Sequence, residues 1–408
     1  MFRKYIFLVL FLLPSLINTS ASGQNTKPIS VKKTLIAVTD SILQSQVDLN
    51  KIPGAVLEIK KGGKVLVKKA YGRAGKDEKM TTKHLFDIAS LTKVVGTTTS
   101  IMLLADKGLI NVDDPVFRYV KTFDSPEKRT ITIRHLLTHT AGLNEWYPLY
   151  YRSSEKKDTY KLIEELPLKY PVGERRSYSD LGFVLLGEII EIVSGIPLDQ
   201  FMKQNIFLPL RMKKTTYNPL ANGRFKKIAS TSEGNPYEKR MVYDSTLGYR
   251  FPEINPDSWI AWRTYTLRGE VNDGNAWYSC GGVSGAAGLF STVDDIQKLV
   301  DLLINKGKTS SGQFISEKTI ETFLTKDSFN NGLGWMMDPA NSFMRNGPDG
   351  SFGHTGFTGT SISVIPAEGI SVILLINRQN TGLLDNKEYY NVNPIRLQIY
   401  NAVSEYLR

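Results

Sequence analysis

The stretch Phe86-Asp87-Ile88-Ala89-Ser90-Leu91-Thr92-Lys93 places a serine and a lysine three residues apart among apolar side chains. The residues that follow, to about Gly108, are mostly apolar and predict a helix that begins at this serine. Residues three apart share one face of a helix, so the Lys93 ammonium can reach the Ser90 hydroxyl. Because burial disfavours the charged form of lysine, we expect a lowered pKa and a Lys93 that accepts or relays the serine proton.

The same Ser-x-x-Lys spacing occurs five times, so the spacing alone has little weight. The other copies begin at Ser30, Ser125, Ser153 and Ser154, in polar or charged surroundings where a lysine would stay protonated. A helix cap is the simpler interpretation of Ser90, because serine is favoured at helix starts. A helix N-terminus also offers free N–H groups to a developing oxyanion. The absence of Gly-x-Ser-x-Gly, His-Glu-x-x-His and P-loop motifs removes the ordinary α/β-hydrolase, zincin and P-loop classes.

Two later segments carry residues that could complete a site around this serine. Residues 171–183 contain Tyr178-Ser179-Asp180 and lead into an apolar helix expected over 184–193. Residues 351–359 contain His354-Thr355-Gly356 and lead into a strand. Glycines on both sides of His354 and Thr355 let the backbone approach a ligand closely.

These three segments, in this order and at this spacing, resemble the serine β-lactamase and penicillin-binding-protein superfamily. The resemblance is greatest to the branch of class C β-lactamases, DD-peptidases and related esterases, whose elements are Ser-x-x-Lys, Tyr-x-Asn and Lys/His-Thr-Gly. Stretches 131–143 and 281–292 support it, and it extends from about residue 33 to the end.

The resemblance implies an exported serine hydrolase that forms an acyl-enzyme on Ser90. Lys93 and Tyr178 would be the proton-transfer pair, with the protonated lysine holding the phenol in a reactive state. The backbone N–H groups of Ser90 and Phe357 would form the oxyanion hole. The residues implied on the substrate side are Asp180, His354, Thr355 and Gly356. A substrate with a reactive carbonyl is expected, for example a cell-wall peptide.

Two positions depart from the family pattern. Asp180 stands where the third residue is usually Asn, which replaces an amide donor with an anion and favours the charged form of Lys93. His354 stands where typical β-lactamases have Lys, which removes fixed positive charge at neutral pH. Both changes argue against an efficient β-lactamase and favour a D-Ala-D-Ala-type carboxypeptidase or an esterase. A low-turnover penicillin-binding or cell-wall-binding protein of the same fold is the alternative.

The hydrophobic pattern predicts an α/β fold with a central antiparallel sheet built from both chain ends and flanked by helices. A mostly helical region is inserted between the two ends, and we expect one β-lactamase/transpeptidase-like domain over residues 33–408. A hairpin signal, Lys61-Gly62-Gly63-Lys64, joins the first two strands. The expected elements are a helix over 33–49, strands over 55–59, 65–71, 360–366 and 370–377, and a helix over 394–407.

The N-terminal residues predict a signal peptide over 1–22. A basic start, an apolar run shorter than the roughly 20 residues of a membrane span and a small polar stretch follow one another. The segment has no cysteine for lipid attachment. We therefore expect a secreted or periplasmic bacterial protein without a stable membrane anchor after cleavage.

Charge and metal-ligand patterns point away from nucleic acids and cofactors. The net charge of +11, from 51 Lys+Arg and 40 Asp+Glu, is dispersed without any run of five basic residues, so no nucleic-acid partner is expected. The single cysteine, Cys280, cannot form an intramolecular disulfide or a thiolate cluster. His135 and His139 could share a helical face, but they lack a further ligand at a fitting spacing, so no metal is expected.

Two aromatic features remain open in the sequence. Trp146, Tyr147, Tyr150 and Tyr151 could fill the core or form a lip over the site. The literal Tyr-x-Asn at 389–391 follows the other motifs, and we interpret it as a chance match.

Overall fold

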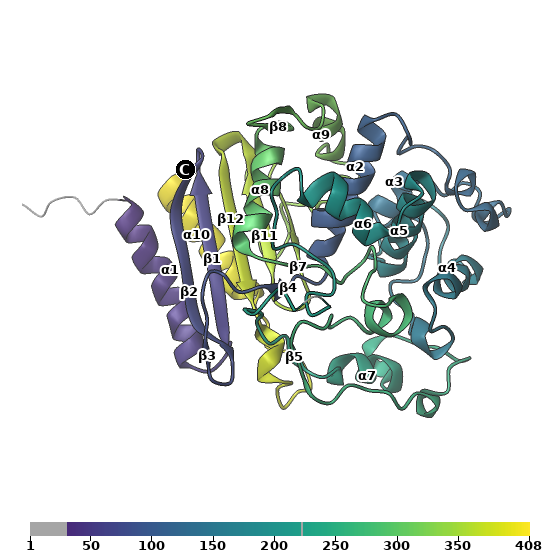
Figure 1. Cartoon of the computed structure of the whole chain (residues 1–408), viewed down its shortest axis with the longest axis horizontal. Coiled ribbons are helices and arrows are strands. Elements are labelled where there is room, and N and C mark those ends of the chain that lie inside the picture. The colour runs from purple at the N-terminus through teal and green to yellow at the C-terminus, as the bar shows by residue number, and fades with distance from the viewer. Residues whose placement is uncertain (1–30, 222) are drawn as a thin grey trace, which may run out of the picture.

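A computed structural model describes residues 31–408 except residue 222, so the predicted signal peptide lies outside the described residues. Its centre is an antiparallel sheet with the strand order β10-β11-β12-β1-β2-β3 (Figure 1). The strands are β1 (Gly54–Lys61), β2 (Lys64–Gly75), β3 (Glu78–Lys79), β10 (Phe352–Thr355), β11 (Ser361–Ile365) and β12 (Ile370–Ile376).

The two chain ends meet at the β1–β12 pair in the middle of this sheet. Ala55 lies opposite Ile376, and the antiparallel register continues to Lys61 opposite Ile370. The β1–β2 hairpin turns through Gly62 and Gly63, both with positive φ, a conformation that glycine adopts without steric cost. The predicted sheet built from both ends is therefore confirmed.

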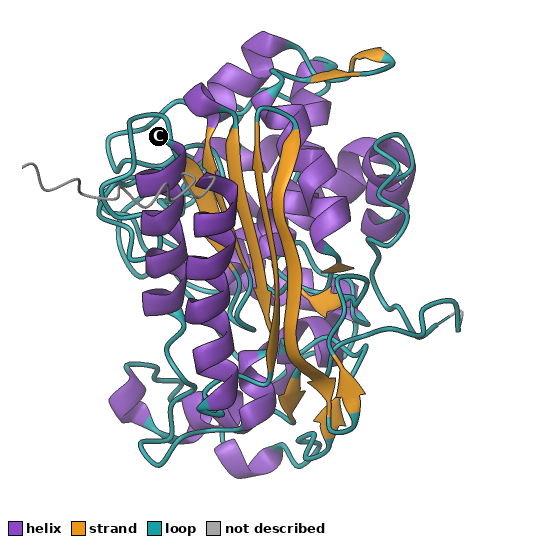
Figure 2. Ribbon diagram, turned by 90° about the vertical axis from the view of Figure 1, so that its left-hand side faces the viewer, coloured by secondary structure: helices purple, strands orange, loops and turns teal. Residues whose placement is uncertain are grey.

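Helices cover both faces of the sheet. On one face lie α1 (Val31–Asp48) and α10 (Asn393–Leu407), side by side in Figure 2. On the other lie α8 (Val293–Ile304) and the helical region. Along β12, Ile373 and Leu375 belong to the apolar cluster of the helical region, whereas Leu374 and Ile376 belong to the cluster under α1 and α10. This alternation is the period of a strand buried on both faces.

The inserted region contains mostly helices and short strand pairs. The segment after Ser90 forms a π-helical turn, Lys93–Thr98, that continues into α2. The helix predicted over 184–193 begins earlier, because Ser179 caps its first turn by accepting a hydrogen bond from the Gly182 N–H, and it ends at Gly195 in the left-handed conformation. The helices are α2 (Thr99–Asp106), α3 (Ile133–Leu137), α4 (Lys156–Glu165), α5 (Asp180–Ser194), α6 (Leu198–Met202), α7 (Pro236–Tyr243) and α9 (Glu317–Phe323), and the short strands are β4 (Phe86–Asp87), β5 (Ser232–Glu233), β6 (Thr266–Leu267), β7 (Phe290–Ser291), β8 (Lys308–Thr309) and β9 (Gly312–Gln313).

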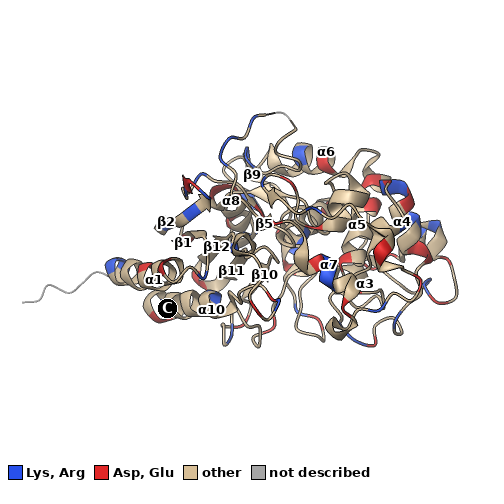
Figure 3. Ribbon diagram, turned by 90° about the horizontal axis from the view of Figure 1, so that it is seen from below, with Lys and Arg blue, Asp and Glu red and all other residues tan. Residues whose placement is uncertain are grey.

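Basic and acidic residues are intermixed along the ribbon of the helical region (Figure 3). Several lysines form ion pairs, such as Lys156 with Glu191 and Lys169 with Glu145, each at 2.6 Å. Among the described residues, no single helix has the length and apolarity to cross a membrane, although the bent pair Asp180–Ser194 and Leu198–Phe207 reaches those values together.

We predict that Ile373→Ala lowers the free energy of unfolding by about 2–5 kcal/mol, because it removes buried methyl groups from a fully buried strand and leaves a cavity. Urea denaturation measures the change. Ile260→Ala is the matched control: Ile260 is 90% exposed, so its loss should change stability by no more than about 0.5 kcal/mol. Equal losses in the two variants would contradict the described core.

Candidate active site

Ser90 lies directly after a strained residue at the end of β4. Ala89 has a φ of 46°, in the left-handed region that a residue with a Cβ adopts at a cost of about 1–2 kcal/mol. The buried Asp87 carboxylate holds this turn by accepting hydrogen bonds from the Ala89 N–H (2.8 Å) and the Asn272 N–H (2.7 Å). Burial raises the pKa of Asp87 to about 6, although these two N–H donors oppose the rise. The backbone therefore presents Ser90 at a fixed position.

The Ser90 hydroxyl faces Lys93 rather than the backbone. The Lys93 ammonium donates a hydrogen bond to Ser90 Oγ at 3.1 Å. In the described part of the chain, no backbone N–H donates to Ser90 Oγ, and the structure gives the first helical turn no side-chain cap. The helix-cap interpretation is therefore wrong.

Lys93 is fully buried, and its ammonium lies among four polar groups, one of which is the Tyr178 phenol. Besides Ser90, it donates a hydrogen bond to the Ala286 carbonyl (2.9 Å) and forms an ion pair with Asp180 Oδ1 (2.6 Å). Burial acts to lower the Lys93 pKa, but Asp180 and Tyr178 outweigh burial and raise the pKa above its ordinary value. The lowering of the Lys93 pKa expected from burial alone is therefore wrong, whereas the direction of this shift agrees with the expectation that Asp180 favours the charged form of Lys93. An ammonium with all three N–H groups engaged is a donor to Ser90 and not a proton acceptor.

Tyr178 packs between this ammonium and a buried histidine. Its ring centroid lies 5.1 Å from Lys93 Nζ and 4.4 Å from the His139 ring. His139 Nδ1 accepts a hydrogen bond from the Ser179 N–H at 3.0 Å, which holds the backbone next to Tyr178. Burial raises the pKa of the phenol; the Lys93 charge opposes that rise, and the Asp180 charge adds to it. Asp180 thus keeps Lys93 charged and makes the phenolate of Tyr178 less favourable.

The segment after β10 is hydrogen-bonded to the segment before Ser90. Thr358 Oγ1 donates to the Asp87 carbonyl (2.8 Å), and Thr360 Oγ1 donates to the Ile88 carbonyl (3.1 Å). A Cβ at Gly356 would lie 2.5 Å from the Ile88 oxygen, so only glycine allows this approach. The proposed oxyanion-hole residues therefore belong to two segments that are hydrogen-bonded to each other.

The peptide unit between Gly356 and Phe357 is oriented by α10. Arg396, buried on that helix, donates to the Gly356 carbonyl at 3.2 Å. In a planar trans peptide the N–H points opposite to the C=O, so the Phe357 N–H points away from Arg396. Within the described residues, neither this N–H nor that of Ser90 donates to another protein atom. Both groups remain available for an oxyanion.

A cavity of about 410 Å³ opens over these groups. Ser90, Tyr178, Asp180 and Phe357 line it, so four of the predicted site residues share one wall. His354, Thr355 and Gly356 do not line it. His354 is buried behind Tyr178, with ring centroids 6.0 Å apart. Burial and the Lys93 charge lower the pKa of His354 to about 3, which leaves this position uncharged at neutral pH as expected.

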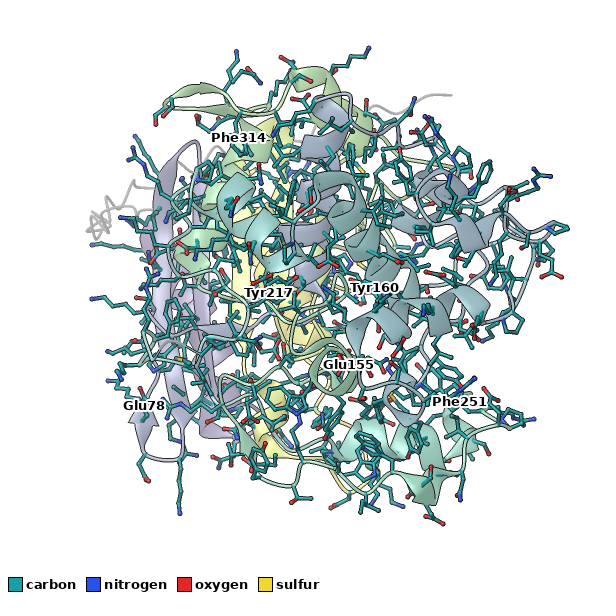
Figure 4. The ribbon with its side chains drawn as sticks, turned by 45° about the vertical axis from the view of Figure 1, so that its right-hand side comes forward. Glu78, Glu155, Tyr160, Tyr217, Phe251 and Phe314 are labelled. Atoms are coloured by element: carbon teal, nitrogen blue, oxygen red, sulfur yellow. The ribbon has the colours of Figure 1, made fainter. Side chains whose placement is uncertain are left out.

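Aromatic side chains provide both core and lip. Trp146 lines the cavity and packs edge-on against Tyr249 at 5.7 Å. Tyr147 is buried in the core. Phe251, which is labelled in Figure 4, packs against both Trp146 and Tyr147. Part of this aromatic segment therefore fills the core, and part of it lines the site.

Sequence patterns missed several other residues that line the cavity. Tyr237 and Glu238 come from α7, Asp273 from the residues just before the π-helical turn Asn275–Ser279, and Tyr389 from the segment interpreted as a chance match. Their positions depend on tertiary contacts between irregular segments, and no local periodicity indicates them. The clearest missed signal was His139, which was rejected as a metal ligand from the sequence and was not placed beside Tyr178. Among the described residues, no three of His, Cys, Asp and Glu are placed to hold a metal ion.

Comparison with known proteins identifies the family. The beta-lactamase family model matches residues 39–395. The chain belongs to the beta-lactamase family. An N-acetylmuramyl-L-alanine amidase of Bacillus subtilis (strain 168) is 34% identical, over 93% of this chain and 88% of the relative. A protein of Escherichia coli (strain K12), provisionally named a D-alanyl-D-alanine carboxypeptidase, is 33% identical, over 86% of this chain and 84% of the relative.

Solved structures of this fold agree with the architecture. EstCE1, described as a hydrolase with promiscuous acyltransferase activity, matches with a TM-score of 0.68 at 20% identity, over 91% of this chain and 99% of its own. A class C β-lactamase of Rhodobacter sphaeroides matches with a TM-score of 0.66 at 19% identity, over 91% and 99%. The predicted β-lactamase/transpeptidase-like fold is confirmed, and the family supports a serine hydrolase.

Proposed function

We propose that this beta-lactamase family member is an exported serine hydrolase that forms an acyl-enzyme on Ser90. Its substrates would be D-Ala-D-Ala-type peptides, esters or β-lactams, with carboxypeptidase or esterase activity favoured over efficient β-lactam hydrolysis. The observation that carries the proposal is the buried Lys93 ammonium, 3.1 Å from Ser90 Oγ at the wall of a cavity. The amidase and carboxypeptidase names of the two relatives both describe hydrolysis of an amide bond.

In the proposed reaction, Ser90 Oγ attacks the substrate carbonyl carbon and its proton passes to the Tyr178 phenolate. The Lys93 ammonium stabilises that phenolate, and the N–H groups of Ser90 and Phe357 stabilise the oxyanion. Collapse of the tetrahedral intermediate breaks the bond to the leaving group, which takes the proton from Tyr178. A water molecule then attacks the acyl-enzyme, its proton returns through Tyr178 to Ser90, and the carboxylic acid is released.

Two features support a preference for peptides or esters over β-lactams. His354 is neutral, so this position supplies no charge for a β-lactam carboxylate. Asp180 replaces an amide donor with a carboxylate committed to Lys93. A low-turnover penicillin-binding protein of the same fold would be acylated at Ser90 but would release product slowly, so turnover separates it from a hydrolase.

We also propose export through the predicted signal peptide over residues 1–22. After expression in a Gram-negative host, we expect the protein in the periplasm, shortened by about 22 residues at its N-terminus. Fractionation followed by N-terminal sequencing measures both. Full-length protein in the cytoplasm would contradict export.

Ser90→Ala should lower kcat/KM for p-nitrophenyl acetate and for a D-Ala-D-Ala peptide by at least about 10³-fold, because it removes the nucleophile. Ser154→Ala is the matched control: Ser154 also begins a Ser-x-x-Lys pattern, but it is exposed and we expect no change. If Ser90→Ala and wild type hydrolysed both substrates at the same rate, the mechanism would be wrong.

The rate should also depend on the protonation of Tyr178. Since burial and Asp180 both raise the phenol pKa, the phenolate is the minor form at neutral pH, and we expect kcat/KM to rise toward alkaline pH. Asp180→Asn removes one of these causes and should shift the rise to lower pH by about one unit. Asp124→Asn, at a half-exposed surface residue, should leave the profile unchanged. An unshifted profile in Asp180→Asn would rule out this role of Asp180.

A further inference from the structure

The lining of the cavity over Ser90 is rich in acidic side chains. It includes the carboxylates of Glu145, Asp180, Glu238 and Asp273, and no lysine or arginine belongs to the lining among the described residues. A cavity of this composition disfavours an anionic ligand and favours a cationic one.

Two of the four carboxylates already have partners. Asp180 pairs with Lys93, and Glu145 pairs with Lys169, each at 2.6 Å. Glu238 and Asp273 form no ion pair within the described part of the chain. These two side chains are therefore the acidic groups that a cationic ligand could pair with, and pairing would favour the ionised form of each.

The surroundings of Glu238 and Asp273 leave part of their hydrogen-bonding capacity unused. Glu238 Oε2 accepts from the Gly274 N–H (2.9 Å). Glu238 Oε1 is buried next to the Tyr150 phenol, which favours the ionised carboxyl but makes no hydrogen bond of normal geometry to it. Asp273 Oδ1 accepts from the Ala276 N–H at 2.7 Å. Burial raises the pKa of Glu238 to about 8 and that of Asp273 to about 6, and the neighbouring carboxylates add to both shifts. A cation bound in the cavity would stabilise both ionised forms.

Within the described residues, Arg263 forms no ion pair with Glu238 or Asp273. Arg263 is buried, and its guanidinium donates to Asn235 Oδ1 and to the carbonyls of Val271 and Asn272. It is a structural cation behind the wall and does not line the cavity.

Aromatic rings surround the same space. Tyr237, Phe357 and Tyr389 pack together with ring centroids 5.5–5.9 Å apart, and all three line the cavity. Trp146 and Tyr249 line it as well. The faces of such rings attract ammonium groups, and the attraction grows when water is excluded. The Arg378 guanidinium already lies 5.2 Å from the Phe357 ring centroid and 5.8 Å from that of Tyr389, so a ligand ammonium is left with the faces of the other rings.

We propose that this cavity selects substrates that carry a cationic amine, which binds between Glu238, Asp273 and the aromatic rings while the reactive carbonyl lies at Ser90. The inference rests on the proposed acyl-enzyme function and names its substrate class. A lysine-type side chain or free amino group of a peptide supplies the required chemistry.

The test compares four p-nitrophenyl esters of similar length: 6-aminohexanoate, 6-hydroxyhexanoate, heptanoate and the monoester of adipate. Wild type should hydrolyse the amino ester with a kcat/KM at least about tenfold above the heptanoate ester, and the adipate monoester should be the poorest substrate. The hydroxy ester controls for hydrogen bonding without charge and should resemble the heptanoate ester. The double variant Glu238→Gln/Asp273→Asn should bring the amino-to-heptanoate ratio close to one. Glu165→Gln, at an exposed position on α4, should retain the wild-type ratio.

The outcomes distinguish a failure of cation selection from a failure of the proposed serine hydrolase function. If no ester is hydrolysed in a Ser90-dependent manner, the proposed function fails. If hydrolysis depends on Ser90 but the amino ester has no advantage over the hydroxy or heptanoate ester, cation selection is overturned and the serine mechanism stands. A preference that persists in the double variant would overturn the assignment to Glu238 and Asp273.

Discussion

The ion pair between Lys93 and Asp180 is the interaction on which the site depends. It brings the helix that follows Ser90 against the first turn of α5, and the same ammonium reaches Ser90 Oγ and the Ala286 carbonyl. A fully buried ammonium is unfavourable unless it is paired and hydrogen-bonded. Removing one partner of a buried pair typically costs about 3–5 kcal/mol, and the partial exposure of Asp180 reduces that figure here. The requirement to pair this charge therefore fixes three segments around the hydroxyl of Ser90.

The central sheet provides the second half of the site. β10 and the loop after it come from the C-terminal part of the chain, yet Thr358 and Thr360 bond to the backbone just before Ser90. Arg396 on α10 donates a hydrogen bond to the Gly356 carbonyl and so orients the peptide unit that contains the Phe357 N–H. The pairing of β1 with β12 joins the two chain ends that carry these elements. A fold closed by both termini thus positions the proposed nucleophile and oxyanion donors relative to one another.

Features set by local sequence periodicity could be predicted, whereas features set by contacts between distant segments could not. The strands near both ends and the helix after Ser90 have their own periodicity, so their existence was predictable, and motif order predicted that Ser90, Lys93 and Tyr178 lie close together. The direction of the Lys93 pKa shift was not predictable from burial alone, because it depends on the 2.6 Å contact with Asp180. Tyr237 and Glu238 lie on a short helix and Asp273 just before a helical turn, and the approach of these segments to Ser90 leaves no pattern in the sequence.

The central claim is that Ser90 is the residue acylated during turnover. The direct measurement is intact mass followed by peptide mapping after reaction with a fluorophosphonate. We predict one phosphonyl adduct per chain, located on the peptide that contains Ser90, and no adduct in Ser90→Ala. An adduct on another residue, or an unmodified Ser90 under conditions where ester hydrolysis is inhibited, would contradict the claim.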